Sequence, residues 1–131
     1  MSNSPLNENP HRTQRTMRVG LGIPSQQELD ELSRSVAALH VEMAQRISRE
    51  EGRGGFFAFI SLAAPRYLTF LETLRAEHHH LLGALTALRA KIARADPSQW
   101  DDLLAETAAV LSAIEEHEEL EREVLRDALE P

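Results

Sequence analysis

Apolar residues recur in steps of three and four along three long stretches of the chain. Steps of this size place side chains on one face of an α-helix, so each stretch predicts an amphipathic helix. The first apolar stripe consists of Leu29, Leu32, Val36, Leu39, Met43 and Ile47. The second consists of Tyr67, Leu71, Leu74, His78, Leu81, Leu85, Leu88 and Ile92. The third consists of Leu103, Thr107, Val110, Ile114, His117, Glu121, Val124 and Ala128.

Local signals give the ends of the first predicted helix. Ser25 followed by Glu28 has the spacing of a capping box, in which the serine side chain accepts a backbone N–H and the glutamate reaches back. The glycines at 52, 54 and 55 end the helix, because glycine favours the turn that follows a helix. The first helix is therefore predicted from residue 25 to about residue 51.

The links between the helices are short. Residues 56–64 form an apolar connection of one or two predicted helical turns, and Pro65 suits the first turn of the second helix. Asp96 or Ser98 caps the third helix, with Pro97 near its first position. Neighbouring helices joined by such short links pack antiparallel.

The fold class predicted is all-α: an antiparallel helical bundle of three long helices plus a short helical connection. Three helices enclose a thin core, so we expect either residues 56–64 to close one end as a lid or a homodimer to complete a four-helix arrangement. Residues 1–24 are polar and contain proline and glycine, which predicts a flexible tail. The helical domain then spans residues 25–131.

Composition excludes several classes of function. The net charge is −7 and no basic patch is present, which argues against nucleic acid as a partner. The chain has no cysteine, so a transition metal would need His and carboxylate ligands. No apolar run approaches the roughly 18 residues of a membrane span, and no secretory signal is evident, so we expect a cytoplasmic protein that does not enter a membrane.

Polar side chains interrupt the second and third stripes at positions that predict burial. His78 lies in the middle of the second stripe, and His117 and Glu121 lie one turn apart on the third. Counting residues from the turns places His78 and His117 within about one helical turn of the same level. A similar count brings His40 of the first helix to that level, and Glu50 falls on the first stripe near the short connection. Carboxylates are rarely buried without a partner or a cation, so a metal site is one reading of this group.

The alternative reading is structural. A single histidine on an apolar stripe is more often a satisfied core residue than a ligand. Glu121 could pair with Arg75, Arg122 or Arg126 at a solvated edge, and Arg46 and Arg49 could pair with Glu50. His78, His117 and Glu121 share one level of the bundle, and for these three residues together this supports metal binding as strongly as the structural alternative.

Three short motifs, taken in order, resemble bacterial hemerythrin-like proteins of the HHE cation-binding group. They are an acidic helix end followed by glycines and an aromatic residue at 50–56, a Glu-His pair at 77–78, and a His-Glu-x-x-Glu motif at 117–121. The resemblance spans about residues 40–128. It implies a four-helix bundle around a non-haem di-iron site and a role in oxygen binding, sensing, metal storage or oxidative chemistry.

The resemblance also implies a ligand set. His78, His117, Glu121 and Glu50, or Glu51 in its place, match ligand positions, and His40 is a further candidate. Arg46 stands where the family has a histidine, four residues before the glutamate. A guanidinium has no lone pair to offer a metal, so His40, a second chain or a reduced site must make up the difference.

Two functions follow as hypotheses. The first is a hemerythrin-like metal-binding protein that holds iron, with manganese and zinc suited to the same ligands and oxygen or peroxide as a small-molecule ligand. The second is a metal-free relative that acts through homodimerisation or partner binding, in which Arg46 pairs with Glu50. An enzyme is not expected, because within the three predicted helices the Glu-x-x-His spacing of ferritin-like sites occurs only at Glu77 and His80, off the apolar stripe.

Overall fold

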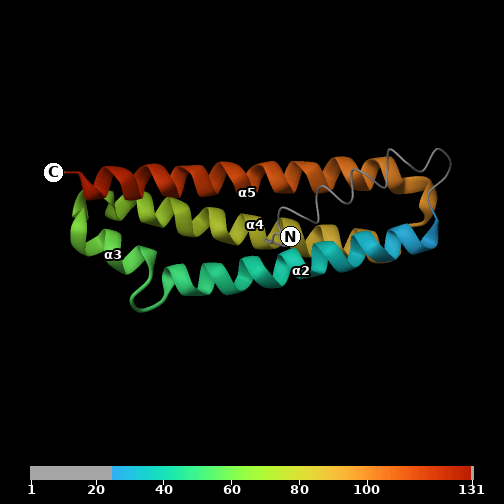
Figure 1. The fold of residues 1–131 in the computed structure, drawn as a ribbon, viewed down its shortest axis with the longest axis horizontal. Helices are drawn as coiled ribbons and strands as arrows, with labels where there is room; N and C mark the ends of the chain where they lie inside the picture. Colours follow the sequence, from blue (N-terminus) through green and yellow to red (C-terminus); the bar gives the residue numbers. More distant parts are fainter. Residues whose placement is uncertain (1–24, 131) are drawn as a thin grey trace, which may run out of the picture.

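The computed structural model describes residues 25–130, which form a helical bundle (Figure 1). Its long helices are α2 (Gln26–Glu51), α4 (Leu68–Arg94) and α5 (Trp100–Leu129). The short helix α3 (Phe56–Ala63) and the 3-10 turn η1 (Pro65–Tyr67) connect α2 to α4, and the 3-10 turn η2 (Pro97–Gln99) connects α4 to α5. The all-α bundle predicted from the sequence is therefore confirmed. The predicted tail lies in residues 1–24, outside the described part.

Successive long helices run antiparallel, and α4 packs against both α2 and α5 (Figure 1). The short α3 continues beyond the end of α2 in roughly the same direction and contacts α2, α4 and α5 (Figure 1). Residues 56–63 thus form the short helical connection predicted from the sequence.

The helix ends follow the predicted local signals. Ser25 and Glu28 form both hydrogen bonds of a capping box, and the Asp96 side chain accepts the backbone N–H of Ser98 at 2.9 Å. Pro65 and Pro97 each begin a 3-10 turn rather than the α-helix itself, so α4 and α5 start three residues later than predicted. A 3-10 turn commonly leads into an α-helix.

Two glycines allow the tight turn that ends α2 and starts α3. Gly54 has a φ of 77°, in the left-handed region that favours glycine. A Cβ at Gly55 would lie 2.0 Å from the backbone oxygen of Arg49, so only glycine fits there. This turn places the last residues of α2 directly beside α3.

The core has two apolar parts. We call the first the large apolar cluster, which joins α2 to the halves of α4 and α5 nearest η2; its buried members are Leu29, Leu32, Val36, Leu39, Met43, Ile47, Leu81, Leu85, Leu88, Ile92, Trp100, Leu103 and Ile114. The second, the small apolar cluster, lies at the α3 end and consists of Phe57, Ile60, Leu71, Leu74 and Val124 with half-buried neighbours. His78, His117 and Glu121 are buried between the two clusters, and we call them the polar layer.

The predicted stripes match the buried residues closely on α2 and α4 and less closely on α5. Thr107, Val110 and Ala128 of α5, and Tyr67 before α4, are half-buried. Among residues 25–130 there are three long helices, and a three-helix core leaves positions at the edges of its stripes partly exposed. Completion of the bundle by a second chain stays a prediction.

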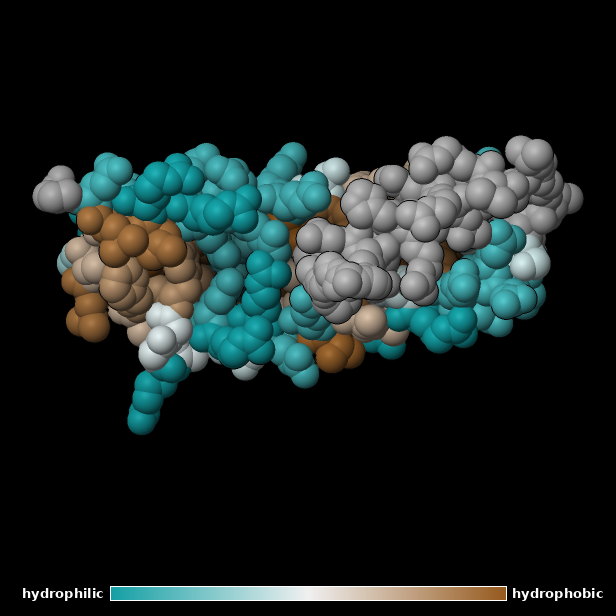
Figure 2. Space-filling view, viewed as in Figure 1, coloured by the Kyte–Doolittle hydropathy of each residue, from teal (hydrophilic) through white to brown (hydrophobic). Residues whose placement is uncertain are grey.

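Apolar side chains reach the surface mainly at the α3 end of the bundle. Phe59, Leu62, Leu68 and Leu129 are all exposed, Leu62 to 85%. Figure 2 shows brown atoms gathered at this end, while polar residues cover most of the described remainder of the same face. Over residues 25–130 no single helix is long and apolar enough to cross a membrane, and one bent pair, the segments Gln26–Ala63 and Pro65–Arg94, meets that test jointly.

Candidate metal site

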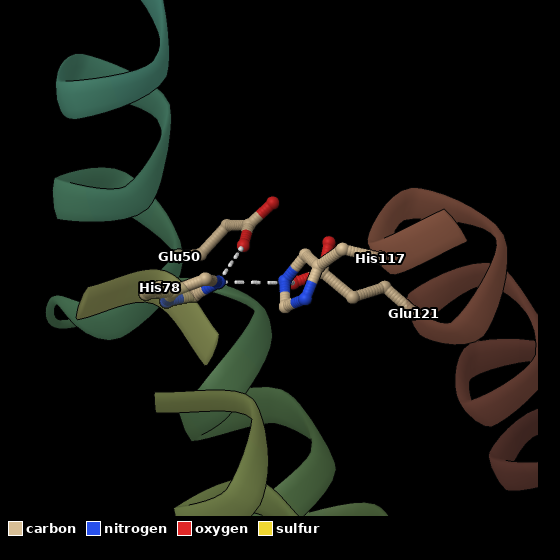
Figure 3. A group of neighbouring side chains, drawn as sticks. All are labelled: Glu50, His78, His117 and Glu121. Atoms are coloured by element: carbon tan, nitrogen blue, oxygen red, sulfur yellow. Dashed lines mark hydrogen bonds and ion pairs between the residues drawn. The ribbon is translucent and has the colours of Figure 1, made fainter. Parts of the chain in front are cut away.

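Glu50 joins the three residues of the polar layer, so that four side chains from three helices converge (Figure 3). Glu50 comes from the last turn of α2, His78 from the middle of α4, and His117 and Glu121 from adjacent turns of α5. One potential ligand atom from each residue lies within 4.8 Å of all the others. The capacity to hold a metal ion, predicted from the stripes, is thus present in the geometry.

The shortest contacts within the group centre on one carboxylate oxygen. Oε2 of Glu121 lies 2.8 Å from Nε2 of His117 and 3.2 Å from Nε2 of His78. Oε1 of Glu50 lies 3.3 Å from the same nitrogen of His78. Both histidine rings therefore turn Nε2 toward the shared centre.

The group is shielded from solvent to different degrees. The side chains of His78 and His117 are 2% and 4% exposed, that of Glu121 is 10% exposed, and that of Glu50 is 20% exposed. Buried charge of this density is costly unless it is paired or bound to a cation. Glu50, at the end of α2, is the member nearest to solvent.

Two further glutamates contact the outer nitrogens of the same rings. Oε2 of Glu51 lies 2.5 Å from Nδ1 of His78, and Oε1 of Glu77 lies 2.6 Å from Nδ1 of His117. Each imidazole thus has a carboxylate at both ring nitrogens.

Residues near the α3 end form one wall of the site. The ring of Phe57 lies 5.5 Å from that of His78, and the guanidinium of Arg75 lies 5.0 Å from the centre of the Phe57 ring. Nη1 of Arg75 also donates to Glu51 at 3.1 Å. The turn at Gly54 and Gly55 is what brings α3 over this side.

The carboxylates favour the protonated form of both histidines. Burial lowers the pKa of His78, but hydrogen bonds to the surrounding carboxylates, Glu121 first, outweigh it and raise the pKa to about 10. Burial likewise opposes protonation of His117, and hydrogen bonds to Glu121 and Glu77 raise its pKa above the ordinary value.

The two carboxylates of the group shift in opposite directions. Burial raises the pKa of Glu50, and repulsion from Glu121 adds to that effect. Burial also raises the pKa of Glu121, but hydrogen bonds from His117 and His78 outweigh it and lower the pKa to about 2. Glu121 is therefore the permanent anion at the centre.

Of the five predicted site residues, the structure brings Glu50, His78, His117 and Glu121 together and keeps His40 apart. Nδ1 of His40 lies 3.1 Å from Nη1 of Arg89. Arg89 is eleven residues beyond His78 on α4, or about 16 Å along the helix. The prediction that His40 lies level with His78 assumed that α2 ends where α4 begins, whereas α3 and η1 separate these two ends along the bundle.

The sequence did not reveal how Glu51, Glu77 and Arg46 would be used. Glu51 was an alternative to Glu50 as ligand, and Glu77 was placed off the stripe; both contact outer histidine nitrogens instead. The predicted pairing of Arg46 with Glu50 is wrong, because Nη2 of Arg46 pairs with Glu118 of α5 at 2.5 Å. Contacts between helices decide these pairings, and spacing along one helix does not report them.

The donor set suits a transition-metal ion. Two imidazole nitrogens and two carboxylates are ligands for iron, manganese and zinc. Bonds of about 2.0–2.2 Å to one ion place neighbouring ligand atoms about 3.0–3.5 Å apart. Oε2 of Glu121 lies 2.8 Å from Nε2 of His117 and 3.2 Å from Nε2 of His78, and both distances are close to this spacing. The residues present therefore fit a single ion.

Comparison of the chain with protein-family models, with curated proteins and with solved structures finds no match.

Proposed function

We propose that this protein binds one transition-metal ion, with iron as the leading candidate, through His78, His117, Glu121 and Glu50. The observation that carries the proposal is the convergence of four donor atoms from three helices within 4.8 Å in a buried layer. Leucine at the same stripe positions would fill the space with apolar contacts. A buried His and Glu layer instead requires a partner for its charges.

The number of donors supports one ion rather than two. A two-iron centre in a helical bundle draws on carboxylate and histidine ligands from all four helices. Here the four converging donors come from three helices, and Glu51 and Glu77 are engaged at outer histidine nitrogens. We therefore propose a hemerythrin-like bundle whose site is reduced to a single ion.

A bound iron(II) with two histidines and carboxylates would keep open positions for a small ligand such as oxygen or peroxide. The chain's own residues supply the rest of the chemistry. Glu121 holds a negative charge at the centre, the two rings present Nε2 to it, and Phe57 excludes water on one side. This arrangement supports a role in sensing or metal handling more directly than catalysis.

Metal analysis of freshly purified protein, together with titration by Fe²⁺, Mn²⁺ and Zn²⁺, tests the proposal. We expect one ion per chain, loss of binding in His78→Ala and His117→Ala, and unchanged binding in His79→Ala. His79 is a matched control because it is the exposed neighbour of His78 on α4. Absence of binding by the wild-type protein, or equal binding by all three variants, would contradict the proposal.

A second candidate function rests on a different observation. Each histidine already lies between carboxylates, so the network can satisfy its charges without a metal. In that case the protein is a structural or partner-binding helical module, with a homodimer as its simplest assembly. It predicts that chelation leaves both the melting temperature and the sedimentation coefficient unchanged. A fall in melting temperature on chelation would exclude it.

A further inference from the structure

The outer nitrogens of the two histidines have dedicated partners that the ligand set does not require. Glu51 contacts Nδ1 of His78 at 2.5 Å, and Glu77 contacts Nδ1 of His117 at 2.6 Å. Nε2 of each ring points the other way, toward Oε2 of Glu121. The same arrangement is therefore built twice, from different residues.

The chemistry of imidazole makes this arrangement directional. A carboxylate cannot donate, so its partner nitrogen must carry the proton. When Nδ1–H donates to a carboxylate, the lone pair of the neutral ring is left on Nε2, and the ring is held at a fixed angle.

We propose that Glu51 and Glu77 are positioning residues, which fix His78 and His117 as Nε2 ligands of the metal ion. This inference rests on the proposed function. It assigns to these two glutamates a role that is separate from ligation.

The two contacts also tie the three helices together at the level of the site. Glu51 of α2 acts on a ring from α4, and Glu77 of α4 acts on a ring from α5. Glu77 directly precedes His78, so one turn of α4 provides both a ligand and the support for the other ligand. The ring directions therefore depend on helix packing, and the site is set before an ion arrives.

The supports differ in how firmly they are held. Glu51 is 22% exposed and is itself fixed by Arg75 at 3.1 Å. Glu77 is 41% exposed. Water competes less for the hydrogen bond of a carboxylate that is more buried and held by a second partner. Removal of Glu51 is therefore expected to weaken metal binding more than removal of Glu77.

The experiment is titration with Zn²⁺, combined with ¹H–¹⁵N NMR of the histidine rings, for the wild type, Glu51→Ala and Glu77→Ala. Metal-free wild type is expected to show a protected Nδ1–H on both rings. Zinc is expected to remove the proton from Nε2 alone. Each variant is expected to lose the protected Nδ1–H of its own histidine only and to bind zinc about 10–100-fold more weakly, Glu51→Ala the more so.

Two matched controls separate positioning from charge and from folding. Glu123→Ala removes an exposed carboxylate of α5 and is expected to leave affinity and ring signals unchanged. Glu51→Gln keeps an acceptor oxygen for Nδ1–H, so an affinity between those of wild type and Glu51→Ala supports positioning.

Different failures identify different errors. If zinc shifts no ring signal in the wild type, the proposed function is wrong, and the positioning role falls with it. If zinc binds the wild type through Nδ1, or if both alanine variants match wild-type affinity within twofold, only the positioning role is overturned.

Discussion

The two ends of the bundle use the same helices and the same stripe spacing for opposite purposes. Toward η2, α2, α4 and α5 share the large apolar cluster, in which Leu85 and Leu103 are fully buried. Toward α3, the stripes of α4 and α5 pass through His78, His117 and Glu121 before apolar packing resumes. Heptad-like spacing therefore specifies that a position is buried, but it does not specify whether the residue at that position packs in the core or binds a ligand.

The two ends of the bundle contribute differently to the stability of the fold and to the specificity of ligand binding. Apolar burial is non-directional, and it accounts for most of the free energy that holds such a bundle together. Buried ion pairs contribute little net stability, because desolvation offsets their attraction, but their geometry is selective. We expect the apolar end to control unfolding and the polar layer to control ligand binding.

Truncation in the large apolar cluster gives the largest expected loss of stability. Leu85→Ala should lower the free energy of unfolding by about 2–5 kcal/mol, because it leaves a cavity at a fully buried site. Zinc affinity should stay within about twofold, since Leu85 is about 10 Å along α4 from His78. Urea unfolding and zinc titration measure the two effects, with the exposed Leu129→Ala as control. A tenfold loss of affinity would show that the two ends are coupled.

Conversion of the polar layer to leucine is expected to abolish metal binding without lowering the free energy of unfolding, the opposite of the result for Leu85→Ala. The triple variant His78→Leu, His117→Leu, Glu121→Leu should abolish zinc binding and leave metal-free stability unchanged or raised by about 1–4 kcal/mol. Glu50, Glu51 and Glu77 are partly exposed and can turn to water. The measurement is urea unfolding in the presence of a chelator. Strong destabilisation would mean that the layer itself holds the bundle.

Zinc should stabilise the folded protein by an amount that rises with the logarithm of the free zinc concentration once this exceeds the Kd. At a free concentration 100 times the Kd, the expected gain in unfolding free energy is about 2.7 kcal/mol. His117→Ala should show none of this gain, because it removes a ligand at the centre. Thermal unfolding at a series of zinc concentrations, followed by chelation, measures it. An equal gain in both proteins would place the ion elsewhere.

The pH dependence of stability should come from the polar layer. The pKa of His78 is raised to about 10, so its contribution to metal-free stability is complete below pH 6.5 and is lost as pH rises through 10. Glu121, with its pKa lowered to about 2, contributes above pH 4.5 and loses that contribution as pH falls toward 2. Between pH 6.5 and 8.5 we expect the melting temperature to fall by roughly 5–10 °C.

The leucine triple variant is the control for this profile. It lacks the titrating groups of the layer, so its melting temperature should change little over the same interval. Parallel curves for the two proteins would assign the pH dependence to groups outside the layer.

The smallest effect is expected at Arg46, which lies one turn before Glu50. Its ion pair with Glu118 joins α2 to α5 and is partly exposed, so Arg46→Ala should cost about 1 kcal/mol or less. Zinc affinity should hold, because neither residue belongs to the ligand group. Urea unfolding and zinc titration test both statements, and a tenfold weaker affinity would make the pair part of the site.

The sequence by itself determined the fold class, the helix ends and most of the core. Apolar spacing along one helix is a local property, so Leu29 to Ile47 and Leu71 to Ile92 could be assigned to buried faces directly. Capping by Ser25 and Asp96 is equally local, because each bond spans two or three residues. The same spacing identified His78, His117 and Glu121 as inward-facing.

The tertiary structure alone decided which polar residues meet. The offset created by α3 brought Glu50 rather than His40 to the level of His78, and it depends on a turn whose geometry no periodicity encodes. The pairing of Arg46 with Glu118, and of Glu51 and Glu77 with the outer histidine nitrogens, joins residues 27 to 72 positions apart in the chain. Side-chain partners across helices depend on axial offset and rotation, which a helix's own sequence pattern leaves free.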